Sequence, residues 1–136
     1  MNLEQARFNM VEQQIRPWDV LDLDILDLLS RLKREDFVPE SAKVLAFVDM
    51  EIPLGNGQKM WQPKMEARVV QDLTIKPTDT ILEIGTGSGY QAAILAVLVN
   101  QVYSIEIVEA LARRAEDDLR RLGYRPATAA ARARHR

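Results

Sequence analysis

The chain has 136 residues, 47% of them hydrophobic and 28% charged, with a net charge of −2 at pH 7, a composition ordinary for one globular domain. It has no cysteine and one histidine, His135, which excludes disulfides and leaves almost no material for a metal site or a Ser-His-Asp triad. No apolar run approaches the roughly 20 residues of a membrane span, and an acid stands near the N-terminus where a secretory signal would be apolar. Acids outnumber bases up to Tyr124, which is not typical of a nucleic-acid-binding surface. We therefore expect a cytoplasmic protein without metal, membrane or nucleic-acid partners.

Two helices are predicted at the start of the chain. The first covers residues 3–15, with Asn2 as its cap and Pro17 at its end. Asp19 is expected to cap the second, whose apolar residues recur at helical spacing. These residues are Leu21, Ile25, Leu28, Leu29 and Leu32.

The next stretch, residues 44–61, shows no regular period, although its Gly-Asn-Gly at 55–57 signals a turn. We therefore assign residues 1–62 to a helical and irregular N-terminal extension. A helix over 63–73 follows, because Pro63 suits a first helical turn and apolar residues then share one face.

The hydrophobic period then changes. Residues 80–84 predict a strand, 91–98 an apolar helix, 101–107 a second strand and 109–122 an amphipathic helix, with Gly123 at the position of a C-terminal cap. This order is that of the opening of a parallel α/β sheet, in which ligands bind at the carboxyl ends of the strands.

Half of the chain's six glycines lie in Gly85-Thr86-Gly87-Ser88-Gly89, directly between the predicted strand and helix. Glycine lets the backbone turn sharply and approach a ligand, and the free N–H groups of the helix start can face it. The dinucleotide fingerprint is G-x-G-x-x-G, whereas this spacing is G-x-G-x-G, typical of nucleoside-methionine binding. A tight turn without a ligand is the alternative.

Two carboxylates flank this loop. Glu83 ends the strand before it and can meet a ligand ammonium, whereas Glu106 ends the next strand and can accept from both ribose hydroxyls. A solvated strand-end acid is the alternative for Glu106. Tyr90 and Gln91 begin the helix and either line the pocket or serve ordinary packing.

Several segments, in the same order, resemble those of one known family. They are residues 10–15 (MVEQQI), 34–39 (REDFVP), 57–58 with 62–63 (GQ and QP), 81–93 (ILEIGTGSGYQAA) and 102–106 (VYSIE). From about residue 9 to 124, the chain thus resembles the protein-L-isoaspartate O-methyltransferase family of S-adenosylmethionine-dependent methyltransferases.

The resemblance implies an α/β, Rossmann-like fold: N-terminal helices followed by the first βαβα unit of a seven-stranded sheet. It implies S-adenosyl-L-methionine as cofactor, and methyl transfer to the carboxyl of isoaspartyl residues in damaged proteins, a repair reaction. The cofactor-binding residues it implies are Glu83, Gly85, Thr86, Gly87, Ser88, Gly89, Tyr90 and Glu106. A carboxylate is already a nucleophile, so alignment with the methyl donor supplies most of the acceleration.

One departure concerns the acceptor side. The family has G-Q-T-I-S-x-P where this chain reads Gly57-Gln58-Lys59-Met60-Trp61-Gln62-Pro63. Trp61 therefore stands where a small hydroxyl belongs. It is either a packing residue over the mouth of the site or a contact to a different acceptor, as in a divergent branch. Lys59 either pairs with a substrate carboxylate or is simply solvated.

The other departure is the end of the chain. We assign residues 63–124 to the start of the cofactor-binding domain and 125–136, rich in Ala and Arg, to a disordered low-complexity tail, as from a truncation or a shifted reading frame. A basic RNA-binding tail is the weaker alternative. Besides the methyltransferase, a non-catalytic remnant and an NAD-type module stay open.

Overall fold

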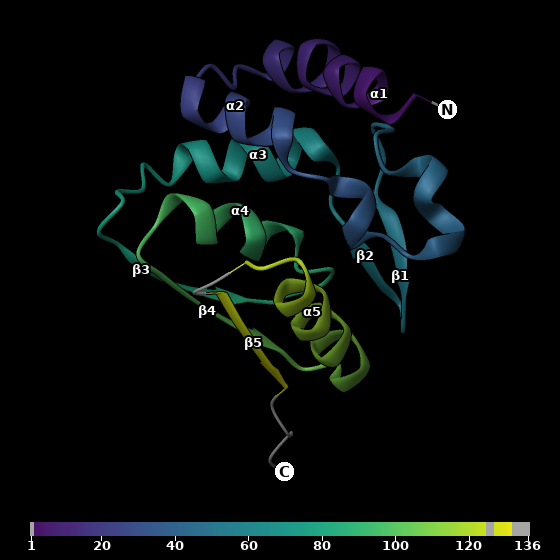
Figure 1. The fold of residues 1–136 in the computed structure, drawn as a ribbon, viewed down its shortest axis with the longest axis vertical. Helices are drawn as coiled ribbons and strands as arrows, with labels where there is room; N and C mark the ends of the chain where they lie inside the picture. Colours follow the sequence, from purple (N-terminus) through teal and green to yellow (C-terminus); the bar gives the residue numbers. More distant parts are fainter. Residues whose placement is uncertain (1, 125–126, 132–136) are drawn as a thin grey trace.

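The structure, a computed structural model, describes residues 2–124 and 127–131. Its α-helices are α1 (Leu3–Met10), α2 (Leu23–Arg31), α3 (Pro63–Asp72), α4 (Tyr90–Leu98) and α5 (Glu109–Arg121). Its strands are β1 (Ile52–Gly55), β2 (Gln58–Met60), β3 (Thr80–Ile84), β4 (Gln101–Glu106) and β5 (Ala127–Ala131). Figure 1 shows α1, then α2 and α3, then α4 in successive layers over the β3–β5 sheet, with the β1–β2 hairpin beside them.

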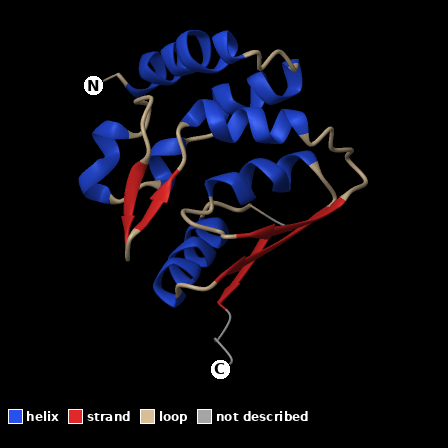
Figure 2. Ribbon diagram, turned by 180° about the vertical axis from the view of Figure 1, so that it is seen from behind, coloured by secondary structure: helices blue, strands red, loops and turns tan. Residues whose placement is uncertain are grey.

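The larger sheet is parallel, in the order β3-β4-β5. Helix α4 connects β3 to β4, and α5 connects β4 to β5, so the βαβ connections predicted from the sequence are present. Along β4 the side chains of Val102 and Ser104 are buried, whereas that of Tyr103 between them is half exposed. Leu82 and Ile84 of β3 are exposed as well. The helices therefore cover one face of this sheet (Figure 2).

Part of the Ala- and Arg-rich segment that was expected to be a disordered tail, Ala127–Ala131, is a strand. This segment is β5, in parallel register with β4 from Val102↔Ala127 to Glu106↔Ala131. Alanine has little β propensity of its own, but a strand ladder is made by backbone groups, and the free edge of β4 offers a row of them. Residues 125–126 and 132–136 of the predicted tail lie outside the described residues.

The N-terminal helices differ in detail from the prediction. The α-helix ends at Met10, and the chain continues as a π-helical segment, Val11–Ile15, and a 3-10 turn, Arg16–Trp18. Asp22, not Asp19, caps α2: its Oδ1 accepts from the N–H groups of Asp24 and Ile25 at 2.9 and 3.2 Å. Asp19 instead takes a left-handed turn conformation, with φ of 61°, which aspartate tolerates better than most residues.

The stretch expected to be irregular contains an antiparallel hairpin, β1–β2. The predicted turn is its tip, where Gly55, Asn56 and Gly57 all have positive φ. Ile52, Leu54 and Met60 are buried, so the hairpin packs its apolar side against the body. The stretch was missed because its apolar residues do not alternate over a long enough run.

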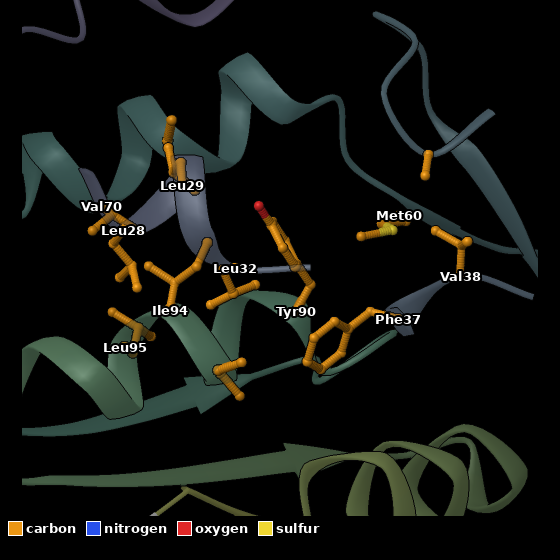
Figure 3. Close-up of a cluster of buried hydrophobic side chains, with 14 of the residues drawn as sticks. Leu28, Leu29, Leu32, Phe37, Val38, Met60, Val70, Tyr90, Ile94 and Leu95 are labelled. Atoms are coloured by element: carbon orange, nitrogen blue, oxygen red, sulfur yellow. The ribbon is translucent and has the colours of Figure 1, made fainter. Parts of the chain in front are cut away.

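Helices α2, α3 and α4 share a core, part of which is drawn in Figure 3. Leu28 and Leu29 of α2, Val70 of α3 and Ile94 and Leu95 of α4 are all buried there. No helix in the described part of the chain is long and apolar enough to cross a membrane.

Candidate ligand-binding site

A cavity of about 480 Å³ opens at the carboxyl end of β3, a volume in the range of small-molecule sites. The hairpin and α3 form one wall, and β3 with the glycine loop forms the other. The lining residues are Gln58–Met60, Trp61, Glu66, Val69, Leu73, 81–88, Gln91, Leu95, Glu106 and Ile107.

The glycine loop is held by β4 at two points. The N–H of Gly85 donates to the carbonyl of Ile105 at 2.7 Å, and the N–H of Gly87 donates to Glu106 Oε1 at 2.9 Å. Gly85 and Gly87 have φ of 94° and 55°, conformations that L side chains rarely adopt. At Gly85 a Cβ would meet nothing within 4 Å, so the bare backbone of this turn is open to a ligand.

Glu106 closes β4 beneath the loop, and its side chain is buried. Besides the Gly87 bond, its Oε2 accepts from the N–H of Val108 at 3.0 Å. Each oxygen of a carboxylate can accept two hydrogen bonds. One acceptor position on each oxygen is therefore left for a pair of donors from the cavity.

Glu83 lies in a short chain of polar contacts. Ser104 Oγ donates to Glu83 Oε1 at 2.6 Å, and the hydroxyls of Ser104 and Thr86 are 2.6 Å apart. Burial raises the pKa of Glu83 to about 7, although the Ser104 hydrogen bond lowers it, and the charges of Glu66 and Glu106 raise it further. A cation in this cavity would favour the ionised carboxylate.

Two residues of the predicted set, Gly89 and Tyr90, do not line the cavity. The side chain of Tyr90 is buried in the core, where its ring makes an edge contact with Phe37 at 5.7 Å between centroids (Figure 3). Gly89 faces α5, and a Cβ there would lie 3.3 Å from Ala115 Cβ. Gly89 thus serves close helix packing, and the cavity keeps Glu83, Gly85, Thr86, Gly87, Ser88 and Glu106 of the predicted set.

On the opposite wall, Lys59 and Trp61 line the cavity and are exposed. The Trp61 carbonyl accepts from Arg34 Nη2 at 2.8 Å, and Arg34 Nη1 donates to Glu66 Oε1 at 2.5 Å. Arg34 is fully buried. Burial lowers the pKa of Arg34, but the charge of Glu66 and its hydrogen bond outweigh this, so the net shift is upward and the guanidinium stays charged.

The sequence did not single out Arg34, Glu66 or Ser104. Charged residues are rarely buried, so Arg34 and Glu66 would normally be placed on the surface. The signal for Ser104 was the alternation along β4, because it lies two residues before Glu106 on the same face. Gln91 does line the cavity, and its Nε2 donates to the Glu66 carbonyl at 3.1 Å.

Carboxylates dominate this cavity. Glu66, Glu83 and Glu106 line it, with Lys59 as the cation on its rim, and Arg34 neutralises Glu66 from behind. The electrostatics therefore favour a ligand that carries positive charge and hydroxyl donors.

The chain is similar in sequence to known proteins of one family. Residues 5–131 match the family model described as protein-L-isoaspartate(D-aspartate) O-methyltransferase (PCMT). The protein-L-isoaspartate O-methyltransferase of Opitutus terrae is 45% identical over 125 residues, covering 89% of this chain and 54% of that protein. Protein-L-isoaspartate O-methyltransferase 2 of Syntrophobacter fumaroxidans is 46% identical over 76% of this chain and 42% of that protein. The chain spans about half the length of the curated relatives it matches.

Solved structures share the fold. A crystal structure described as a protein-L-isoaspartate O-methyltransferase from Plasmodium falciparum, in complex with S-adenosyl-L-homocysteine, matches with a TM-score of 0.77 at 18% identity, over 97% of this chain and 63% of that one. Another protein-L-isoaspartate O-methyltransferase matches with a TM-score of 0.76 at 22% identity, over 94% of this chain and 41% of that one. The Rossmann-like α/β fold class predicted from the sequence is confirmed.

Proposed function

Because the chain belongs to the protein-L-isoaspartate O-methyltransferase family, we propose that it forms the cofactor-binding part of a methyltransferase. The methyl donor is S-adenosyl-L-methionine, and the acceptor is the carboxyl of L-isoaspartyl residues in damaged proteins or peptides. The proposed role is protein repair. A cytoplasmic location and the lack of a nucleic-acid partner, expected from the sequence, stay predictions.

The observation that carries the proposal is the glycine loop between two strand-end carboxylates. Gly85 and Gly87 present bare backbone to the cavity, Glu106 retains an acceptor position on each oxygen, and Glu83 is a partly buried carboxylate with a raised pKa. A nucleoside with two ribose hydroxyls and a cationic amino-acid end would satisfy both acids. These residues therefore fit the group that the family name implies.

In the proposed site, Glu106 accepts from the ribose hydroxyls and holds the loop to β4 through the N–H of Gly87. Glu83 faces the ammonium, with Ser104 fixing the orientation of its carboxylate. The bound cofactor supplies an electrophilic methyl group on a sulfonium, whose sulfur is a good leaving group. The residues of the chain need only align an acceptor carboxylate with that methyl group, so no general base is required of them.

A second candidate is methyl transfer to a different acceptor. Trp61 favours it, because an indole stands on the cavity wall where the family motif has a small hydroxyl. The cofactor side of the proposal is the same in both candidates.

Calorimetric titration with S-adenosyl-L-homocysteine tests the cofactor site, with a pair of matched variants. Gly87 and Gly123 both have positive φ, so valine strains the backbone at either position, but of the two only Gly87 lines the cavity. We expect Gly87→Val to weaken binding by about tenfold or more and Gly123→Val to leave affinity unchanged. Equal affinities in the two variants would contradict the proposed site.

A further inference from the structure

The cavity has a second wall that the proposed cofactor contacts leave unused. It begins with β2, where exposed Gln58 and Lys59 precede buried Met60, and Trp61 follows on the exposed side again. Alternate residues of an extended chain face the same side. Lys59 and Trp61 therefore share a side of this wall, and both line the cavity.

The backbone that carries Trp61 is fixed from inside the protein. Arg34 donates to the carbonyls of Trp61 and Ala46 at 2.8 and 2.7 Å and to the Glu66 carboxylate at the start of α3. Its guanidinium carbon lies 4.7 Å from the centroid of the Tyr90 ring. One buried side chain thus joins the hairpin wall to α3 and to the first residue of α4.

The indole, in contrast, is half exposed, at 48% of its surface. A large apolar ring held at the rim of the cavity is costly to leave in water and gains most when a planar or apolar group covers it. The neighbouring Lys59 is the one cation among the cavity-lining residues of the described chain. The pair offers a flat apolar surface beside a positive charge.

From this arrangement, and resting on the proposed methyltransferase function, we infer that Trp61 is a specificity-determining residue for the acceptor. It selects acceptors in which an aromatic side chain adjoins the carboxylate. The indole of Trp61 packs against this aromatic side chain, and Lys59 pairs with the carboxylate. For the proposed substrate class, the acceptor is an isoaspartyl peptide with an aromatic residue next to the isoaspartate.

The test uses two fluorescein-labelled isoaspartyl peptides that differ only in the residue after isoaspartate, phenylalanine or glycine. Their affinities for the full chain are measured by fluorescence anisotropy in saturating S-adenosyl-L-homocysteine. Aromatic pairs contribute enough to change affinity by about 3- to 10-fold, so we expect the phenylalanine peptide to bind that much more tightly. Trp61→Ser abolishes the preference, whereas Trp61→Phe keeps most of it.

Trp18 provides a matched control, because it is also partly exposed but does not line the cavity. Trp18→Ser is expected to leave the preference unchanged. Equal affinities of the two peptides for the unaltered chain, no binding of either peptide, or a preference that survives Trp61→Ser would each overturn the inference. Calorimetry with S-adenosyl-L-homocysteine alone reports separately on the proposed function, whose failure is the absence of that binding.

Discussion

The two walls of the cavity are built in different ways. The glycine-loop wall consists of backbone in left-handed conformations, fixed by hydrogen bonds to β4 and its terminal Glu106. The hairpin wall presents the side chains of Lys59 and Trp61, and its backbone depends on the buried Arg34. The first wall admits few substitutions, whereas the second can change the residues that meet an acceptor without disturbing its frame. In the proposed function, this difference lets one chain keep the family's glycine motif, on the cofactor side, and depart from its G-Q-T-I-S-x-P segment, on the acceptor side.

The largest effect is expected from removing the frame of the hairpin wall. Arg34→Met leaves the buried Glu66 carboxylate without its cation, which costs about 3–5 kcal/mol of unfolding free energy. Urea denaturation followed by circular dichroism measures it. Arg31→Met is the control, because the Arg31–Asp27 pair is exposed on both sides and is worth about 0.5 kcal/mol or less. Similar losses in the two variants would show that Arg34 does not hold this wall.

On the glycine-loop wall, Gly89→Ala is expected to destabilise more than Gly123→Ala. Both glycines have positive φ, so each alanine costs about 1–2 kcal/mol of backbone strain. At Gly89 the new Cβ also lies 3.3 Å from Ala115 Cβ of α5, whereas at Gly123 it meets nothing within 4 Å. Overpacking should add about 1–3 kcal/mol at Gly89 alone. Thermal melts of both variants measure the difference, and equal shifts would contradict the assigned contact with α5.

The partly buried Glu83 of the same wall should make the free energy of unfolding depend on pH. The pKa of Glu83 is about 7 in the folded protein and near 4.3 when unfolded, so between these values the folded state binds the extra proton. Stability from this group is therefore full at low pH and falls as pH rises to 7, by at most about 1.4 kcal/mol per pH unit.

Glu83→Gln, which keeps an acceptor for Ser104, removes the pH dependence of stability that this carboxyl causes. The variant should match the unaltered chain near pH 4 and exceed it at pH 8, in urea denaturation across that range. Parallel pH profiles of the two proteins would refute the assignment of the raised pKa to Glu83.

The smallest effect on stability is expected for Trp61→Ser. Because the indole is half exposed and no described ring contact involves it, the unfolding free energy should change by about 0.5 kcal/mol or less. Urea denaturation of Trp61→Ser and Arg34→Met side by side then shows whether the hairpin wall is stabilised by Arg34 and not by Trp61. A loss of several kcal/mol would mean that Trp61 is a packing residue, the alternative kept open by the sequence.

The sequence predicted the elements whose pattern is local. The α3 helix, strands β3 and β4 and the α5 helix lie within a residue or two of their predicted bounds. Each has a clear period, and Pro63, Gly85 and Gly123 mark the start of α3 and the ends of β3 and α5. Strand β5 was missed because its alanines carry no strand signal, and the neighbouring β4 edge decides its conformation.

The same contrast holds for the site. The glycine loop and Glu83 lie in one contiguous motif, and Glu106 ends the strand that follows, so these residues were predictable. Arg34 and Glu66, in contrast, are 32 residues apart in the sequence and meet only in the fold. The sequence left two alternatives open for Tyr90 for a related reason: its position in the motif says where α4 begins, and the direction of its ring toward Phe37 is set by tertiary packing.

The proposed binding of a cationic nucleoside by the glycine loop and its two flanking acids can be tested by calorimetric titration of the full chain with S-adenosyl-L-methionine and, separately, with NAD. The titration belongs at pH 8, above the pKa of about 7 of Glu83, where most of this carboxyl is ionised. We expect one-to-one binding of S-adenosyl-L-methionine and no heat with NAD. Binding of NAD without binding of S-adenosyl-L-methionine, or binding of neither, would contradict it.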